Sequence, residues 1–166
     1  MLKRSFPPVV APNTRLLILG SLPGDRSLAE ARYYAHPQNQ FWRLLSPVIG
    51  HDLMALPYED RLAALLARGI GLWDVVATAL RPGSTDAAIR DIAGNDLAAL
   101  AATLPELQAI AFNGATAAKH GAPLLGEHPA PRITLPSSSP LHTIGLAAKQ
   151  PAWDALKPFV QGPPCR

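Results

Sequence analysis

The chain has 166 residues, of which 48% are hydrophobic and 16% charged, so it can bury the core of one domain and is not a disordered protein. Its 15 basic and 12 acidic residues give a net charge of +3, and the pI of about 9.4 permits nucleic-acid binding without establishing it. Cys165 is the only cysteine, which excludes disulfides within the chain, cysteine-built zinc fingers and iron–sulfur clusters.

No apolar run reaches the roughly 18 residues of a membrane-spanning helix, and the N-terminal segment lacks a signal-peptide pattern. The sequence therefore predicts a cytoplasmic protein with no membrane partner. We expect a single domain over residues 1–166, present as a monomer, with residues 1–13 as an extended arm and residues 161–166 as a flexible tail.

The first predicted strand covers residues 16–19, an uninterrupted apolar run of the kind that a parallel sheet buries on both faces. It ends at a sharp turn over residues 20–24. Ser27 and Glu30 then have the spacing of a capping box, which predicts a short helix.

Residues 33–42 form the stretch around which we expect the chain to be organised, a loop that becomes a helix at Pro37. Asn39 then falls in the first helical turn. At about 100° per residue it points almost opposite the apolar stripe that begins at Phe41, where it can meet a ligand. The alternative is an Asn that only caps the helix. Pro47 should break this helix.

The rest of the chain alternates helices and strands. The predicted elements are a helix over residues 58–68 closed by Gly69, a strand over 70–76, a loop over 81–86, a helix from Asn95 to about residue 103, a strand over 109–112, an alanine-rich helix after Asn113-Gly114, a strand over 132–135, a loop over 136–142 and a last helix over 153–160.

This alternation predicts an α/β fold, a three-layer, doubly wound sandwich in which helices flank a mainly parallel four-stranded sheet. Ligands of such sheets bind beyond the carboxyl ends of the strands. Three unusual segments follow predicted strands, namely residues 20–24, 113–114 and 136–142. We expect them to converge with residues 33–42 on one cleft.

Several chemistries are excluded by pattern. Residues 20–24 match neither the dinucleotide fingerprint nor the phosphate-binding P-loop, and no serine lies in a nucleophile elbow. The five histidines lack zinc-ligand spacing, so we expect no metal site.

What remains is a cleft of amides, hydroxyls and aromatic rings. Tyr34 offers a stacking surface, and the carboxamide of Asn113 suits the edge of a nucleobase, unless Asn113-Gly114 is only a turn. The loop over residues 136–142 has hydroxyls and backbone amides suited to phosphates, and its Leu141 could enter a base stack. The alternative is a Pro-Ser loop without function.

Four segments together resemble a known family: residues 20–24 (GSLPG), 33–42 (YYAHPQNQFW), Asn113 and 135–140 (LPSSSP). They resemble the uracil-DNA glycosylase superfamily, and most closely its sixth family, the hypoxanthine-DNA (deoxyinosine) glycosylases. The similarity extends from about Leu16 to Phe159, and the ten-residue segment is its most specific part.

Differences from the other families of the superfamily support the resemblance to the hypoxanthine family. Mismatch-specific uracil/thymine glycosylases carry Asn at the position of Leu22, and the main uracil-DNA glycosylases have Asp in that first motif and His at the position of Leu135. The iron–sulfur families need four cysteines. In the hypoxanthine family, the resemblance implies, the catalytic amide lies at the position of Asn39.

The resemblance implies a monofunctional enzyme that hydrolyses the N-glycosidic bond of deaminated bases flipped out of DNA, hypoxanthine and also uracil, and so initiates base excision repair without a cofactor. Asn39 would position the attacking water. The other expected roles are base binding by Ser21, Leu22, Tyr34 and Asn113, DNA binding by Ser137, Ser138 and Ser139, and insertion of Leu141, or alternatively His142, into the duplex.

Two alternatives remain open, a mismatch-type uracil/thymine-DNA glycosylase and a DNA lesion-binding protein that keeps the fold without catalysis. We expect DNA binding to depend on a local basic patch of Arg26, Arg43, Arg132 and Lys149. The order of substrates and the roles of Asp74, Arg81 and Ser84 are not determined by the sequence.

Overall fold

The computed structural model describes residues 2–84 and 89–161. Its centre is a four-stranded parallel sheet in the order β3-β2-β6-β7. The strands are β2 (Leu16–Gly20), β3 (Ile70–Asp74), β6 (Ala109–Asn113) and β7 (Arg132–Leu135). Every residue of β2 and β6 is buried, as the continuous apolar runs of these two central strands require. The predicted α/β fold class is therefore confirmed.

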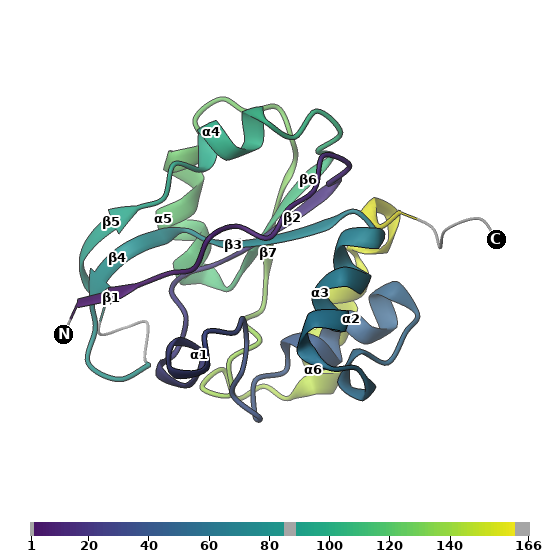
Figure 1. Ribbon diagram of the computed structural model, residues 1–166, viewed down its shortest axis with the longest axis horizontal. Helices are drawn as coiled ribbons and strands as arrows, with labels where there is room; N and C mark the ends of the chain where they lie inside the picture. The colour runs from purple at the N-terminus through teal and green to yellow at the C-terminus, as the bar shows by residue number, and fades with distance from the viewer. Residues whose placement is uncertain (1, 85–88, 162–166) are drawn as a thin grey trace.

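Helices cover both faces of this sheet (Figure 1). One face carries α2 (Phe41–Ile49), α3 (Tyr58–Ala67) and α6 (Leu146–Asp154), and the other carries α4 (Leu97–Ala102) and α5 (Ala115–Leu125). Alternate residues of β2 pack into the cores on the two sides of the sheet, because successive side chains of a strand point to opposite faces. Leu16 and Ile18 join the first core, and Leu17 and Leu19 join the second.

A second sheet, which the sequence did not predict, lies beside the first. It is antiparallel, with the order β1-β4-β5, and consists of β1 (Leu2–Arg4), β4 (Val76–Leu80) and β5 (Arg90–Gly94). The single strand predicted over residues 70–76 ends at Asp74, and β4 begins only two residues later. The N-terminal arm follows the same side of the molecule, where Val9 forms an antiparallel bridge with Leu72.

The start and end of α2 differ from the prediction. The helix begins at Phe41 rather than at Pro37, because residues 36–38 form a turn in which the Asn39 N–H donates to the His36 carbonyl at 2.9 Å. Pro47 lies inside the helix instead of ending it. Its ring is exposed, and the helix continues to Gly50, whose φ of +68° closes it.

Two predicted helix caps are also wrong. Ser27 is buried inside the short helix α1 (Asp25–Glu30), where its hydroxyl accepts from the Ala35 N–H at 3.0 Å instead of capping. Asp96, not Asn95, caps α4 by accepting from the Ala99 N–H at 3.0 Å.

The C-terminal half of the chain also departs from prediction in its last helix. That helix is α6, which begins at residue 146 rather than 153 and is followed by the short η3 (Lys157–Phe159). Another short helix, η1 (Leu53–Ala55), joins α2 to α3, and α3 itself ends within one residue of its predicted end. Residues 162–166 of the expected tail, and residues 85–86 of the predicted loop, lie outside the described residues. Gln161, the first residue of that tail, is described, and its N–H donates to the Arg68 carbonyl at 2.8 Å.

Candidate functional site

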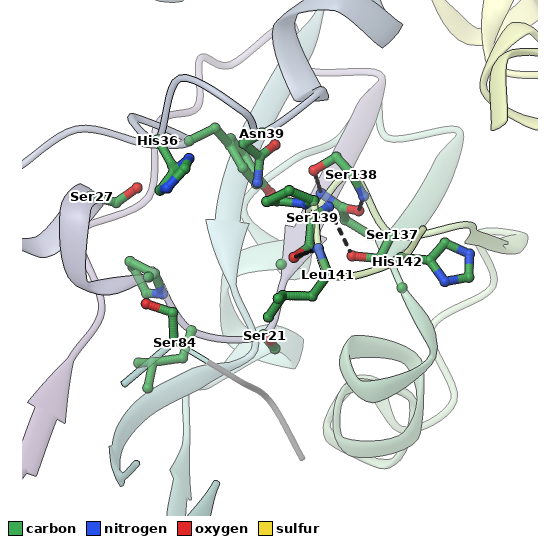
Figure 2. A pocket seen from close by; sticks show the side chains of 18 of the residues that line it. Ser21, Ser27, His36, Asn39, Ser84, Ser137, Ser138, Ser139, Leu141 and His142 are labelled. Carbon is green, nitrogen blue, oxygen red and sulfur yellow. Dashed lines mark hydrogen bonds between the residues drawn. The ribbon is translucent and has the colours of Figure 1, made fainter. Parts of the chain in front are cut away.

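A cleft of about 580 Å³ opens at the carboxyl ends of the parallel strands. Figure 2 shows the serine loop (residues 136–142) on one side, His36 and Ser84 on the other, and Asn39 between them. All ten residues with a predicted role line it: Ser21, Leu22, Tyr34, Asn39, Asn113, Ser137, Ser138, Ser139, Leu141 and His142. Residues from four separate segments therefore meet, as the position of ligands in such sheets predicts.

Asn39 is half-buried at the wall of the cleft, one residue before the N-cap of α2. Its Oδ1 accepts a hydrogen bond from the Phe41 N–H at 3.0 Å. The side chain thus bonds to the first residue of the helix and lines the cleft at the same time. A carboxamide oxygen accepts two hydrogen bonds, so the bond to Phe41 fixes the amide and leaves capacity for a water molecule.

Tyr34 stacks on Phe41, with ring centroids 3.7 Å apart and an interplanar angle of 10°. Its backbone φ of +53° is uncommon for a residue other than glycine and sets the direction of the ring as it enters the cleft. Phe41 covers one face of the ring. A planar base can therefore stack only against the other face.

The turn after β2 is held through two of its backbone carbonyls. The Gly20 carbonyl accepts from the Val75 N–H at 2.7 Å, and the Ser21 carbonyl accepts from the Val76 N–H at 3.0 Å. In a trans peptide the next N–H points opposite to the carbonyl, so the N–H groups of Ser21 and Leu22 face away from β4. Gly20 is required here, because a Cβ would lie 2.6 Å from Asp74 Oδ1.

Asn113 bonds to the serine loop through both ends of its carboxamide. Its Nδ2 donates to Ser138 Oγ at 2.9 Å, and its Oδ1 accepts from the Ser138 N–H at 2.9 Å. One donor hydrogen and one lone pair remain for a base. In the structure Asn113 therefore first holds the loop, a contact that the sequence did not predict.

The three serines of the loop differ in exposure. The Oγ of Ser137 accepts from the Ser139 N–H and the Oγ of Ser139 from the Leu141 N–H, both at 3.1 Å. Each hydroxyl proton of these half-buried serines is then left to donate outward. Ser138 is only 1% exposed, and its hydroxyl faces Asn113.

Leu141 and His142 lie at the outer end of the loop. Leu141 is 62% exposed, which is unusual for a large apolar side chain and leaves it free to enter another molecule. The His142 ring points away from Asn39 (Figure 2).

Arg81 is a site residue whose place the sequence did not reveal. Its guanidinium is fully buried and donates to the Leu22 and Pro23 carbonyls at 3.2 and 2.5 Å and to the Gly83 carbonyl at 2.9 Å. It therefore holds the turn that lines the cleft. No local pattern distinguishes such an arginine from an exposed one in a Pro-Gly loop.

The predicted basic patch is wrong for Lys149, and Arg132 lies away from the cleft. Lys149 is 0% exposed. Arg132 begins β7, at the sheet edge opposite the cleft, where it donates to the Gly126 carbonyl at 3.0 Å. Arg26 lines the cleft and is exposed, and Arg43 is exposed on α2. Surface position depends on tertiary packing, which residue type alone does not determine.

Burial shifts the pKa of two groups near the site. Burial raises the pKa of the Tyr33 phenol far above 10.0, and the negative charge of Asp74 adds to the shift. Burial lowers the pKa of Lys149 from its ordinary 10.5.

Residues 2–84 and 89–161 contain neither a cluster of metal ligands nor a membrane-spanning helix. No three His, Cys, Asp or Glu side chains of these residues are grouped so that they could hold a metal ion. None of the helices in the same ranges combines the length and apolar character of a membrane-spanning segment.

Comparison with known proteins agrees with this geometry. The family model of the uracil DNA glycosylase superfamily matches residues 7–157. Proteins named hypoxanthine DNA glycosylase from Methanosarcina barkeri and Methanosarcina acetivorans are each 41% identical, over 92% and 94% of this chain and 96% and 98% of their own lengths.

A solution NMR structure of a Methanosarcina acetivorans protein described as a uracil DNA glycosylase superimposes with a TM-score of 0.86 at 41% identity, covering 95% of this chain and 97% of that one. Family, relatives and fold thus agree over nearly the whole chain. The chain belongs to the uracil DNA glycosylase superfamily and is a DNA glycosylase.

Proposed function

We propose that the chain hydrolyses the N-glycosidic bond of hypoxanthine in DNA that contains deoxyinosine, with uracil as a second substrate, and leaves an abasic site. The observation that carries this proposal is the place of Asn39, in the wall of the cleft and oriented by the Phe41 N–H. The names of the two relatives that are 41% identical support hypoxanthine as the base.

The reaction requires the nucleotide to leave the duplex, at a cost of a few kcal/mol. In our proposal Leu141 enters the gap, and the hydroxyls of Ser137 and Ser139 hold the phosphates of the lesion strand. The exposure of Leu141 and the inward acceptor bonds of both serine oxygens support these roles.

The flipped base then stacks against the face of the Tyr34 ring that Phe41 does not cover. The Ser21 and Leu22 N–H groups and the remaining capacity of Asn113 read its edge. Hypoxanthine and uracil both present a carbonyl beside an N–H, so one amide accepts either base by the same pattern. The same backbone donors stabilise the negative charge of the departing base, which is where most of the rate enhancement should arise.

The sugar passes through an oxocarbenium-like state, and water attacks its anomeric carbon. An amide is a weak base, so Asn39 contributes by placing this water rather than by removing its proton. Among the described residues no lysine lines the cleft. This supports a monofunctional reaction without a Schiff base.

Asn39→Ala tests the proposal. We expect the variant to lose at least about 100-fold in single-turnover excision of hypoxanthine, because the water is no longer positioned. Its affinity for the duplex should change by less than about 3-fold. The assay uses duplexes with deoxyinosine, uracil or a G·T mismatch and scores alkali-labile sites. Gln38→Ala, an exposed neighbour in the same cleft, is the matched control.

The outcome separates the candidate functions. Near-normal excision by Asn39→Ala would reject its catalytic role. A wild-type protein that cleaves only the uracil and mismatch duplexes is a mismatch-type enzyme, and one that binds without cleaving any duplex is a lesion-binding protein. We further infer a cytoplasmic monomer that needs no cofactor. Excision in the presence of EDTA tests whether a metal cofactor is needed, and light scattering tests the monomeric state.

A further inference from the structure

Lys149 is a charged side chain buried behind the cleft, and no step of the proposed reaction uses it. It lies in α6 and is 0% exposed. Its ammonium donates to Gln40 Oε1 at 2.8 Å and to the Ser139 carbonyl at 3.2 Å. Lys149 therefore contacts both the residue that follows Asn39 and the serine loop.

A second hydrogen bond joins the same two segments directly, since the Gln40 N–H donates to the Ser138 carbonyl at 2.9 Å. The carbonyls of Ser138 and Ser139 are thus both turned inward, onto Gln40 and Lys149. Carbonyl oxygens carry partial negative charge and would repel a phosphate. Turning them inward leaves the hydroxyls of the loop to meet the DNA backbone.

The charge of Lys149 is costly. Within the described residues it has no acidic partner, only two neutral oxygen acceptors. Burying an ammonium in this way is unfavourable before its hydrogen bonds are counted, and burial lowers the pKa of Lys149. An apolar side chain of similar volume would fill the same space at least as well, so packing does not explain a lysine here.

We propose that Lys149 is a positioning residue, which holds the Asn39 segment and the serine loop at a fixed separation. When the loop grips the phosphates of the lesion strand, this separation sets the distance from Asn39 to the anomeric carbon. The inference rests on the proposed function. It adds a residue that touches neither the base nor the water and acts through Gln40.

A double-mutant cycle on Lys149→Met and Gln40→Met tests the coupling. Methionine matches glutamine in length, is one atom shorter than lysine, and removes the hydrogen bond between the two side chains. The probe is a duplex with one deoxyinosine, assayed with enzyme in excess, and the same duplex without the lesion gives the dissociation constant. Lys157→Met, an exposed lysine just beyond α6, is the matched control.

We expect Lys149→Met to lower the single-turnover rate constant about 10- to 100-fold, with less than about a 3-fold change in the dissociation constant and an unchanged or higher Tm. Gln40→Met should also slow excision, and the double variant should be no slower than Lys149→Met. Lys157→Met should match the wild type.

The proposal would be overturned if the rate loss of the double variant equalled the product of the two single losses. It would also be overturned if Lys149→Met lost as much affinity for DNA as it lost in rate. If Lys149→Met lowers the Tm and slows excision while Gln40→Met does not slow excision, the role of Lys149 is structural instead. If Lys149→Met does not fold, a normal rate for Gln40→Met overturns the proposal and a slow one supports it. Excision by the wild type tests the glycosylase function separately, and uracil replaces deoxyinosine if only uracil is cleaved.

Discussion

Tyr33 and Tyr34 are adjacent in the chain but have different surroundings. Tyr34 enters the cleft at a positive φ and stacks on Phe41. Tyr33 is 3% exposed, its hydroxyl donates to the Pro7 carbonyl at 2.9 Å, and its N–H donates to the Tyr58 hydroxyl at 2.9 Å. At this scale Tyr33 fastens the N-terminal arm to the segment that carries Asn39.

Tyr33→Phe should therefore show a stability that depends on pH. Below pH 10 the variant should be about 1 kcal/mol less stable, because the bond to Pro7 is lost. The Tyr33 pKa is raised in the folded state, so above pH 10.0 the unfolded wild type ionises and the folded one does not. Wild-type stability then falls as pH rises, by about 1.4 kcal/mol per unit, and the difference should close near pH 11.

Urea unfolding at several pH values from 8 to 11 measures this difference. Only the wild type carries the Tyr33 phenol, so the difference between the two proteins follows its ionisation. A gap between the two stability curves that stays constant through pH 11 would show that the phenol ionises normally in the folded protein.

At the scale of elements, the loop from β7 to α6 is held by hydrogen bonds within its first four residues, 136–139. The Asn113 carboxamide holds Ser138, the Trp153 indole donates to the Pro136 carbonyl at 3.0 Å, and Lys149 holds Ser139. The first part of the loop is fixed by these bonds, while Leu141 beyond it is exposed. A rigid base with one projecting apolar side chain is suited to insertion into a base stack.

Leu141→Ala should slow excision from a fully paired duplex by at least about 10-fold more than excision from a single strand, since only the duplex has a gap to fill. Stability should change by no more than about 0.5 kcal/mol, because the side chain is exposed. Single-turnover rates on the two substrates measure the effect.

Ile144→Ala is the matched control for this experiment. Ile144 is 53% exposed on the same connection but is not among the residues that line the cleft. Its removal should leave both rates near the wild type. Equal losses on paired and single-stranded DNA for Leu141→Ala would exclude the inserting role.

At the scale of the whole molecule, the direction of the parallel sheet separates two kinds of surface. The carboxyl ends of the four parallel strands lead into the cleft, and their amino ends lie at the opposite end of the sheet. A basic side chain can therefore contact DNA held at the cleft only if it belongs to the first of these ends. Arg26 does, and Arg132 does not.

Arg26→Ala should lower the magnitude of the slope of log K against log salt concentration by about 0.9, the value for one lost phosphate contact, whereas Arg132→Ala should leave it unchanged. Fluorescence anisotropy with a labelled duplex over a range of salt concentrations gives both slopes. A reduced slope for Arg132→Ala would place the DNA elsewhere on the molecule.

Local patterns predicted much of this protein and failed where distant residues compete with them. Continuous apolar runs predicted the four parallel strands within two residues. Pro37 failed as a helix start because the serine loop accepts the Gln40 N–H and the chain turns before α2. The second sheet was missed because β4 follows β3 after one residue, and its partners β1 and β5 carry no apolar alternation that reveals a sheet.

The sequence by itself determined which segments reach the cleft, since the order of strands and helices fixes the carboxyl edge of a parallel sheet. It also determined the chemistry of the cleft, through amides, hydroxyls and aromatic rings without a phosphate-binding motif. Only the tertiary structure decided which polar groups form hydrogen bonds with one another. Asn113 holds Ser138, Arg81 holds the first turn and Lys149 is buried, because burial and hydrogen-bond partners depend on residues far away in the chain.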